Sequence, residues 1–297
     1  VYVLNEEEIR KIEKKEAVQK LDIIDCDLYK FKLAILKNGN VDIILTANHM
    51  ISDSWSMGIV IQEILKNYNS LKKGEEFAKD TFSYEEYINS ENEYKQSEKF
   101  IKDKVYWNEI FQTIPEQVTI PSFKNNTSKI TNKANRISFE INTKICNEIN
   151  EYCKNTKITP FSFFMAIYSL YIGRVSNTDD FVIGTPILNR TNFREKNTIG
   201  MFINTAPVRV KKSENKTFTE YTSNIATNMM GILRHQKYSY NKFLEDLREK
   251  NENIPNLYNI ILSYQITKAF DEKLGNYNTR WTFNDYCGND INIHIHD

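Results

Sequence analysis

The chain has 297 residues, of which 40% are hydrophobic and 26% are charged, and its 39 basic residues are matched by 39 acidic ones. This composition is typical of a globular protein large enough for about two domains, and the balanced charge argues against a nucleic-acid partner. No stretch reaches the roughly 18 apolar residues that a membrane span requires, and no signal-peptide pattern opens the chain. We therefore expect a cytoplasmic protein with no membrane partner.

The four cysteines are scattered, without a Cys-x-x-Cys pair and without histidines at zinc-ligand spacing. We expect Cys26, Cys146, Cys153 and Cys287 to be free and structural, as isolated intracellular cysteines usually are. The first residue is Val1 rather than methionine, so we expect the chain to be a portion of something longer.

The first third of the chain reads as helix, hairpin, helix, helix. Apolar residues at helical spacing predict helices over residues 4–21, 55–71 and 83–111. Two strand-like runs, residues 28–37 and 41–48, flank Asn38-Gly39, a dipeptide that readily adopts the positive φ angles of a tight hairpin turn.

His49 and Asp53 lie where the second of these strands gives way to a helix. A loop between a strand and a helix is where a rigid scaffold displays reactive side chains. Two plainer interpretations stay open: His49 as a surface loop histidine, and Asp53 as a carboxylate that stabilises the helix N-terminus by about 0.3–1 kcal/mol.

Residues 113–135, rich in polar residues and containing Pro115 and Pro121, read as a linker. After it the pattern predicts strands and helices in alternation, which indicates an α/β architecture. The strands are predicted at 136–141, 180–186, 258–265, 279–284 and 291–295, and residues 199–205 are predicted to lead into a further strand that runs through 210. The helices are predicted at 143–155, 160–173, 217–236 and 241–250.

The other histidines suggest no metal site. His294 and His296, followed by Asp297, share one face of a predicted strand, a spacing that a metal could use. Alternation of isoleucines with polar residues explains the pair equally well, so we expect no metal there. His235 falls in the last turn of a predicted helix, where the dipole favours a cation, and we expect it to be structural.

The stretch Asn48-His49-Met50-Ile51-Ser52-Asp53-Ser54, followed by Trp55-Ser56-Met57-Gly58, resembles the His-His-x-x-x-Asp-Gly motif of nonribosomal peptide synthetase condensation domains. Further blocks resemble the same family in the same order. They are Tyr106-Trp107, residues 180–190, residues 199–205, Arg234-His235-Gln236 and residues 259–265. The chain departs from the motif twice, because Asn48 replaces its first histidine and Ser54 its glycine.

The resemblance implies two chloramphenicol-acetyltransferase-like subdomains that form a V with a substrate tunnel between them. Carried over, residues 1–115 are the N-terminal subdomain, residues 116–134 the linker and residues 135–297 the C-terminal subdomain. Members of the family begin earlier and end later than this chain. We therefore expect a fragment that lacks the family's N-terminal portion and C-terminal end.

The activity that the resemblance implies is condensation, in which an acceptor amine attacks a donor acyl or peptidyl thioester and an amide forms. No cofactor is expected to bind directly, because the family's substrates arrive on the phosphopantetheine of donor and acceptor carrier protein domains. An adenylation domain is a further candidate partner.

The resemblance also assigns roles to site residues. His49 would accept the proton of the attacking amine or stabilise the tetrahedral intermediate, since an imidazole has a pKa near 6.5. Asp53 would form an ion pair with Arg190 behind the histidine loop. Asn48 keeps a donor and an acceptor that can shape that loop, and Asn204 would either donate a hydrogen bond near the tunnel or cap a turn.

Two alternatives remain. One is a related stand-alone acyltransferase of the same fold, with a hydroxyl acceptor or a coenzyme A donor. The other is a degenerate, non-catalytic docking module, for which Asn48, Ser54 and the missing ends are the arguments.

Overall fold

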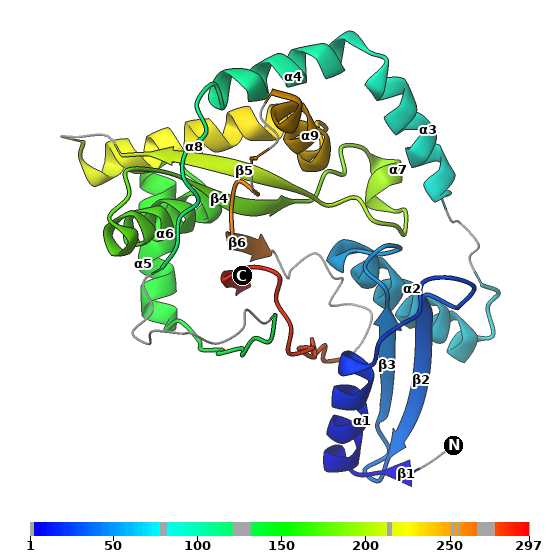
Figure 1. The fold of residues 1–297 in the computed structure, drawn as a ribbon. Coiled ribbons are helices and arrows are strands. Elements are labelled where there is room, and N and C mark those ends of the chain that lie inside the picture. Colours follow the sequence, from blue (N-terminus) through cyan, green and yellow to red (C-terminus); the bar gives the residue numbers. More distant parts are fainter. Residues whose placement is uncertain are drawn as a thin grey trace.

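The computed structural model describes residues 3–77, 82–120, 132–212, 216–250, 253–254, 256–265 and 277–296. Within them the chain forms two separate sheets, with strand orders β1-β2-β3 and β5-β4-β6-β7. Figure 1 shows the smaller sheet with α1 and α2 in the lower, blue part and the larger sheet with the remaining helices above it. The layered α/β architecture expected from the alternation of helices and strands is confirmed.

The lower part contains β1 (Val3–Leu4), α1 (Glu6–Val18), β2 (Tyr29–Leu36), β3 (Val41–Ala47) and α2 (Ser54–Lys73). The hairpin of β2 and β3 forms as expected because Gly39 adopts the positive φ of +86° that its turn requires. Asn5 caps α1 through a capping box with Glu8. Gly74, at φ +72°, ends α2 in the left-handed conformation.

A helical pattern was expected over residues 83–111, and the structure is helical over most of that range. The structure has two helices there, α3 (Tyr84–Lys95) and α4 (Glu98–Ile110). The side chain of Ser97 accepts a hydrogen bond from the Phe100 N–H and so caps the start of α4. A serine cap begins a new helix without glycine or proline in the break.

The upper part is built on the larger sheet, in which β4 pairs antiparallel with β5 and parallel with β6, and β6 pairs parallel with β7. Its strands are β4 (Asp180–Ile187), β5 (Asn204–Lys211), β6 (Ile260–Gln265) and β7 (Ile291–His296). Its helices are α5 (Thr143–Thr156), α6 (Pro160–Ser176), α7 (Phe193–Lys196), α8 (Phe218–Arg234) and α9 (Tyr240–Lys250).

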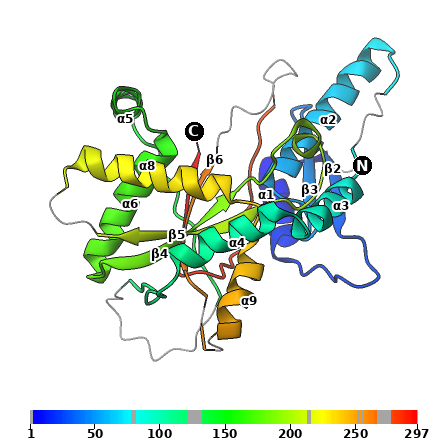
Figure 2. The ribbon, with the colours of Figure 1, turned by 90° about the horizontal axis from the view of Figure 1, so that it is seen from above.

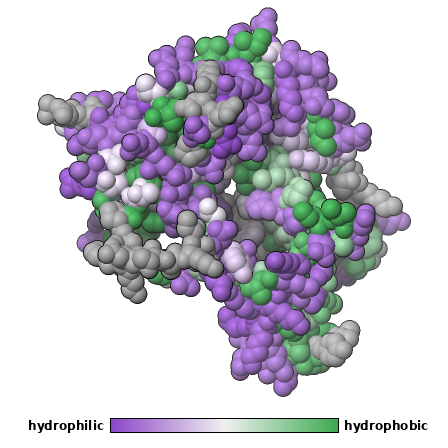
Figure 3. Space-filling view, viewed as in Figure 1, coloured by the Kyte–Doolittle hydropathy of each residue, from purple (hydrophilic) through white to green (hydrophobic). Residues whose placement is uncertain are grey.

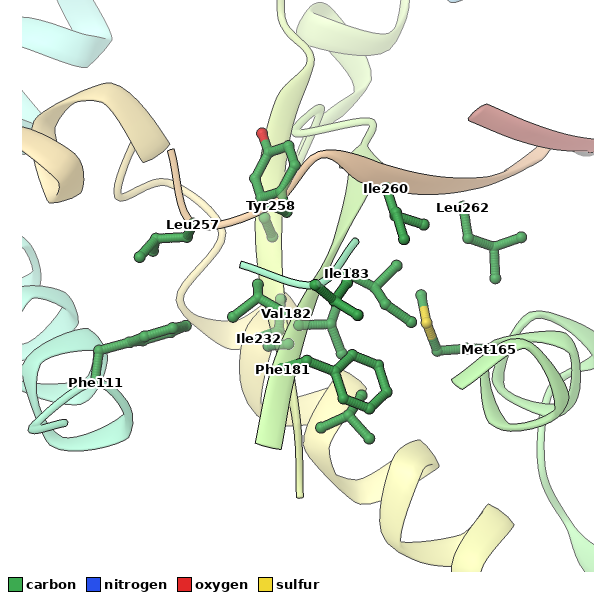
Figure 4. Packing of buried hydrophobic residues seen from close by; sticks show 14 of the residues in the cluster. Phe111, Met165, Phe181, Val182, Ile183, Ile232, Leu257, Tyr258, Ile260 and Leu262 are labelled. Atoms are coloured by element: carbon green, nitrogen blue, oxygen red, sulfur yellow. The ribbon is translucent and has the colours of Figure 1, made fainter. Parts of the chain in front are cut away.

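The main hydrophobic core lies around β4. Consecutive residues of this strand, Phe181 to Ile183, are buried, which is typical of a strand covered on both faces. Figure 4 shows them among side chains from β6, α6, α8 and the end of α4. The core therefore fixes the end of β4, from which the chain continues to Arg190.

Two expected strands, residues 136–141 and 279–284, are absent, so these predictions are wrong. Ile137 and Phe139 are 87% and 84% exposed. A strand needs a hydrogen-bonded neighbour as well as alternating side chains, and in the described residues this region pairs only through an isolated bridge between Lys133 and Tyr286.

Several segments join the two parts. Figure 2 shows α1, α2, β2 and β3 grouped at one side of the molecule, with α3 and α4 running from them to the larger sheet. Trp107 of α4 and Phe111, directly after that helix, belong to the main core. Arg209 on β5 donates to the Ile110 and Thr113 carbonyls, both at 2.7 Å. Near the C-terminus, Arg280 pairs with Glu13 of α1.

The expected linker overlaps residues 121–131, which lie outside the described residues. Ahead of them, Val118 is buried in the main core. The subdomain boundaries at 115 and 135 stay a prediction.

In the described part of the chain, no single helix is long and apolar enough to cross a membrane. The helices α5 and α6 form a bent pair at 103° to each other, and they meet the length and composition criteria for a membrane span only when they are taken together.

Candidate active site

The loop between β3 and α2 displays His49 at the surface. The Asn48 N–H donates to the Leu28 carbonyl at 2.8 Å, which ties the loop to the start of β2. The Asn48 side-chain oxygen accepts from the Met50 N–H at 2.9 Å, an Asx turn of the kind that shapes loops. Asn48 thus makes a hydrogen bond within the loop, while no described residue hydrogen-bonds the His49 imidazole.

Asp53 anchors the other end of the loop. Its carboxylate accepts from the Ser56 N–H at 2.8 Å and so caps α2. It also accepts from the Phe202 N–H at 3.1 Å, across the two parts of the molecule. The Arg190 guanidinium donates to both carboxylate oxygens, at 3.0 and 3.2 Å. The capping interpretation and the expected ion pair are therefore both confirmed.

Arg190 reaches Asp53 from the loop that follows β4, and both side chains are 0% exposed. The guanidinium also donates to the carbonyls of Thr198, at 2.6 Å, and of Glu195. It stacks 3.8 Å above the Phe202 ring, a cation–π contact. Burial lowers the pKa of Arg190, and the Asp53 carboxylate opposes that shift. This density of partners is what allows a buried charge.

Asn204 lies away from this cluster, at the start of β5. Its amide donates to the carbonyls of Gln236 and Tyr238 at 2.9 and 3.1 Å, and its oxygen accepts from the Tyr240 N–H at 3.1 Å. Gln236 and Tyr238 belong to the turn between α8 and α9, and Tyr240 is the first residue of α9. Of the two roles open to Asn204, capping a turn is the one that these hydrogen bonds fulfil.

The surroundings of the remaining histidines indicate structural roles. His235, directly after α8, contacts the buried Asp103 at 2.6 Å and stacks on Tyr106. His294 and His296 lie on the exposed face of β7, and the described residues contain no group of three metal-binding side chains. Asp297 lies outside the described residues. The four cysteines are free, as expected.

The comparison with known proteins decides the family, because the condensation-domain model matches residues 3–295. The chain belongs to the condensation-domain family. It is 33% identical over 285 residues to surfactin synthase subunit 1 of Bacillus subtilis (strain 168), covering 96% of this chain and 8% of that protein. It is 25% identical over 233 residues to bacitracin synthase 3 of Bacillus licheniformis, covering 78% of this chain and 4% of that protein.

Among solved structures, the NRPS condensation enzyme VibH superposes with a TM-score of 0.78 at 16% identity, covering 97% of this chain and 66% of that one. The fold expected from the motif resemblance is thereby confirmed as that of condensation domains. This condensation-domain chain spans only a small part of its curated relatives and 66% of the solved chain.

Ser56 is a functional candidate that the sequence analysis missed. Its buried hydroxyl accepts from Arg190 at 2.7 Å and from the Gly200 N–H at 3.0 Å, and it donates to the Gly200 carbonyl at 2.7 Å. The hydroxyl therefore joins α2, Arg190 and the segment before β5. The adjacent Trp55 indole donates to the Lys196 carbonyl at 2.9 Å. A serine in the first turn of a helix gives no sequence signal for such contacts.

In this condensation-domain chain, the atoms around Gly200 lie too close to leave room for a side chain at that position. A Cβ there would lie less than 3.0 Å from three atoms of the Tyr84 ring. That ring is held by a hydrogen bond from its hydroxyl to the Met201 carbonyl, at 2.5 Å, and by an edge contact with Phe202. The ring cannot retreat without losing these contacts.

Gly200→Ala is expected to lower the free energy of unfolding by about 1–3 kcal/mol, because the added methyl overpacks a filled site. Urea denaturation measures it. Gly288→Ala is the matched control, since a Cβ at Gly288 has no atom within 4 Å. In a Tyr84→Ala background the Gly200→Ala loss should shrink, and an undiminished loss would contradict the packing explanation.

Proposed function

We propose that this chain is part of a condensation domain that forms an amide bond between a donor acyl or peptidyl thioester and an acceptor amine. Both substrates would be delivered on the phosphopantetheine of carrier protein domains, and an adenylation domain would load the acceptor. Family membership supports the reaction class. The observation that supports the proposal most directly is the position of His49. This residue is exposed on a loop whose two ends are fixed by Asn48 and Asp53.

In the proposed reaction the acceptor nitrogen attacks the thioester carbonyl and forms a C–N bond. The tetrahedral intermediate carries a positive ammonium and a negative oxygen. Loss of one ammonium proton and cleavage of the C–S bond then give the amide, and the departing thiolate takes up a proton. No enzyme nucleophile is needed, because the thioester is already activated.

His49 is the proposed catalytic residue. A neutral imidazole can accept the ammonium proton, or it can hydrogen-bond to the zwitterionic intermediate. In either role one ring nitrogen must be free to face the substrate, and no described residue hydrogen-bonds the exposed His49 ring. We assign Asp53 and Arg190 to positioning, since they are buried and hold α2 against the segment before β5.

A comparison of an amine acceptor with a hydroxyl acceptor distinguishes the proposed condensation domain from the related acyltransferase. The intact protein that contains this chain is given the donor acyl group on a carrier or on coenzyme A, with either an aminoacyl carrier or the matched hydroxyacyl carrier as acceptor. Intact-protein mass spectrometry follows the acceptor carriers. We expect the aminoacyl carrier to gain the donor acyl mass and the hydroxyacyl carrier to react at least about tenfold more slowly, because a neutral amine is the stronger nucleophile.

Three other outcomes contradict the proposal. Equal or faster transfer to the hydroxyl acceptor favours the ester-forming acyltransferase. Transfer from a coenzyme A thioester but not from the carrier-bound donor favours the coenzyme A-dependent one. Transfer to neither acceptor from either donor, with both carriers loaded, favours the docking module that the Asn48 substitution suggests.

A further inference from the structure

A cavity of about 460 Å³ lies at the end of the larger sheet where β4 begins. Its walls come from α6 and the turn after it, the start of β4, the end of β5 and the start of α8. Because β4 has 8 residues, its two ends lie roughly 26 Å apart at about 3.3 Å a residue. Figure 1 shows α6 at the left of the larger sheet and α7, which follows Arg190, at its right. The cavity is therefore separate from the His49 loop.

The interior of the cavity is apolar. Phe181 and Val210 form part of its buried wall, and Leu170 and Phe218, which are 39% and 40% exposed, lie nearer the solvent. Small-molecule sites are mostly apolar and have volumes of about 300–1,000 Å³. On the face in view in Figure 3, the surface over this end of the larger sheet is mainly hydrophilic. These features favour a small ligand over a protein partner, which would need a wider apolar surface.

Two hydroxyls, those of Ser169 and Tyr221, also line the cavity and form a hydrogen-bonded pair at 2.7 Å. The Ser169 hydroxyl donates its only proton to the Ala166 carbonyl at 2.8 Å. The Tyr221 hydroxyl is therefore the donor within the pair. Burial raises the pKa of Tyr221, so this proton stays in place at neutral pH. Neither hydroxyl has a proton left to donate to an anionic ligand.

The cations at the cavity differ in how far they are already paired. Lys212 forms an ion pair with Asp179 at 3.0 Å. Hydrogen bonds at the start of α8 and the charge of Lys216 together lower the pKa of Glu220. Arg174, in the last turn of α6, is exposed and has no ion-pair or hydrogen-bond partner among the described residues. Its guanidinium is thus free to bind an anion, and its two parallel N–H donors match a carboxylate.

We propose that this cavity binds a small amphipathic anion, such as a carboxylate with a medium-length alkyl chain. The apolar body lies against Phe181 and Val210, and the charged group lies at Arg174. The lining sets this orientation, because the free donors are at the rim while the inner hydroxyls offer only acceptors. The site goes beyond the acyl transfer proposed for His49 and does not depend on it.

Equilibrium dialysis of the intact protein with radiolabelled octanoate tests the ligand class. We expect saturable binding with a Kd below about 1 mM. Unlabelled 1-octanol, which has the same chain without the charge, should compete at least about tenfold more weakly than octanoate. Butyrate should also compete at least about tenfold more weakly, because its shorter chain buries less apolar surface. The absence of saturable binding, or equal competition by 1-octanol or butyrate, would overturn the proposal.

Substitutions at the surface locate the binding in this cavity. Arg174→Gln should weaken octanoate binding at least about tenfold, because it removes the charged partner. The matched control is Arg234→Gln, since Arg234 is also an exposed arginine in the last turn of a helix, at the other end of α8 from the cavity.

Leu170→Glu should also weaken octanoate binding at least about tenfold, because it places a like charge in the lining. Its control is Tyr171→Glu at the next residue, which is 56% exposed and is not part of the lining. We expect both controls to bind octanoate as the natural chain does. Unchanged binding by Arg174→Gln or by Leu170→Glu, or an equal loss in the controls, would overturn the proposal.

Discussion

Arg190→Met is expected to destabilise the protein by about 3–5 kcal/mol, because it leaves the Asp53 carboxylate buried and without its counter-ion. It also removes the donors to the Thr198 and Glu195 carbonyls. Such a loss is a large fraction of the stability of an ordinary domain. The free energy of unfolding from urea denaturation, followed by tryptophan fluorescence, measures it.

Arg194→Met is the matched control, since Arg194 forms an ion pair with Glu86 in which both side chains are more than half exposed. Exposed pairs contribute about 0–1 kcal/mol. The double variant Asp53→Leu/Arg190→Met should lose less than the sum of its single variants, because the two side chains are in contact. Additive losses, or equal effects at Arg190 and Arg194, would contradict the account of the buried pair.

Local signals in the sequence predicted much of the fold. The hairpin of β2 and β3 followed from Asn38-Gly39, and α2 followed from its apolar spacing and from Asp53 as a cap. These features depend on residues within a few positions of one another. Propensity and side-chain periodicity report such short-range preferences.

Features that depend on distant partners could not be predicted from local pattern. The alternation in residues 136–141 resembles that of β7, yet only β7 has a neighbouring strand along its length. The break between α3 and α4 is a local feature that was nevertheless missed, because Ser97 resembles any helical surface serine until the hydrogen bond that it accepts from the Phe100 N–H is seen.

The site residues divide in the same way, into those that local sequence pattern predicts and those that depend on distant partners. Local pattern marked His49 and Asp53, but Arg190 lies 137 residues from Asp53 and was assigned only through the family resemblance. Ser56 and Gly200 fall within stretches that resemble the family, but no role was assigned to either. Their importance arises from tertiary contacts with each other and with Tyr84, which no spacing rule in a single sequence encodes.

His49→Ala is expected to abolish most amide formation, with a loss of roughly 10²–10⁴-fold, the usual contribution of a positioned general acid–base group. The side chain is exposed and has no hydrogen-bond partner among the described residues, so its removal should leave the free energy of unfolding unchanged within about 0.5 kcal/mol. A large loss of activity without loss of stability distinguishes a catalytic histidine from a structural one.

Asn48→His is the informative companion, because it restores the residue that the family motif has at this position. The Asn48 side chain already shapes the loop through its hydrogen bond to the Met50 N–H. We therefore expect Asn48→His to transfer the donor acyl group at a rate within a few fold of the natural chain. The natural chain needs no second imidazole if loop geometry is what this position supplies.

Single-turnover acyl transfer between loaded carriers in the intact protein, read by intact-protein mass spectrometry, tests this account most directly. If His49 is the catalytic residue, the natural chain and Asn48→His transfer the donor acyl group, and His49→Ala transfers almost none. Full transfer by His49→Ala would remove His49 from the chemistry. An inactive natural chain that Asn48→His restores would show that this site, as it stands, is not a working condensation site.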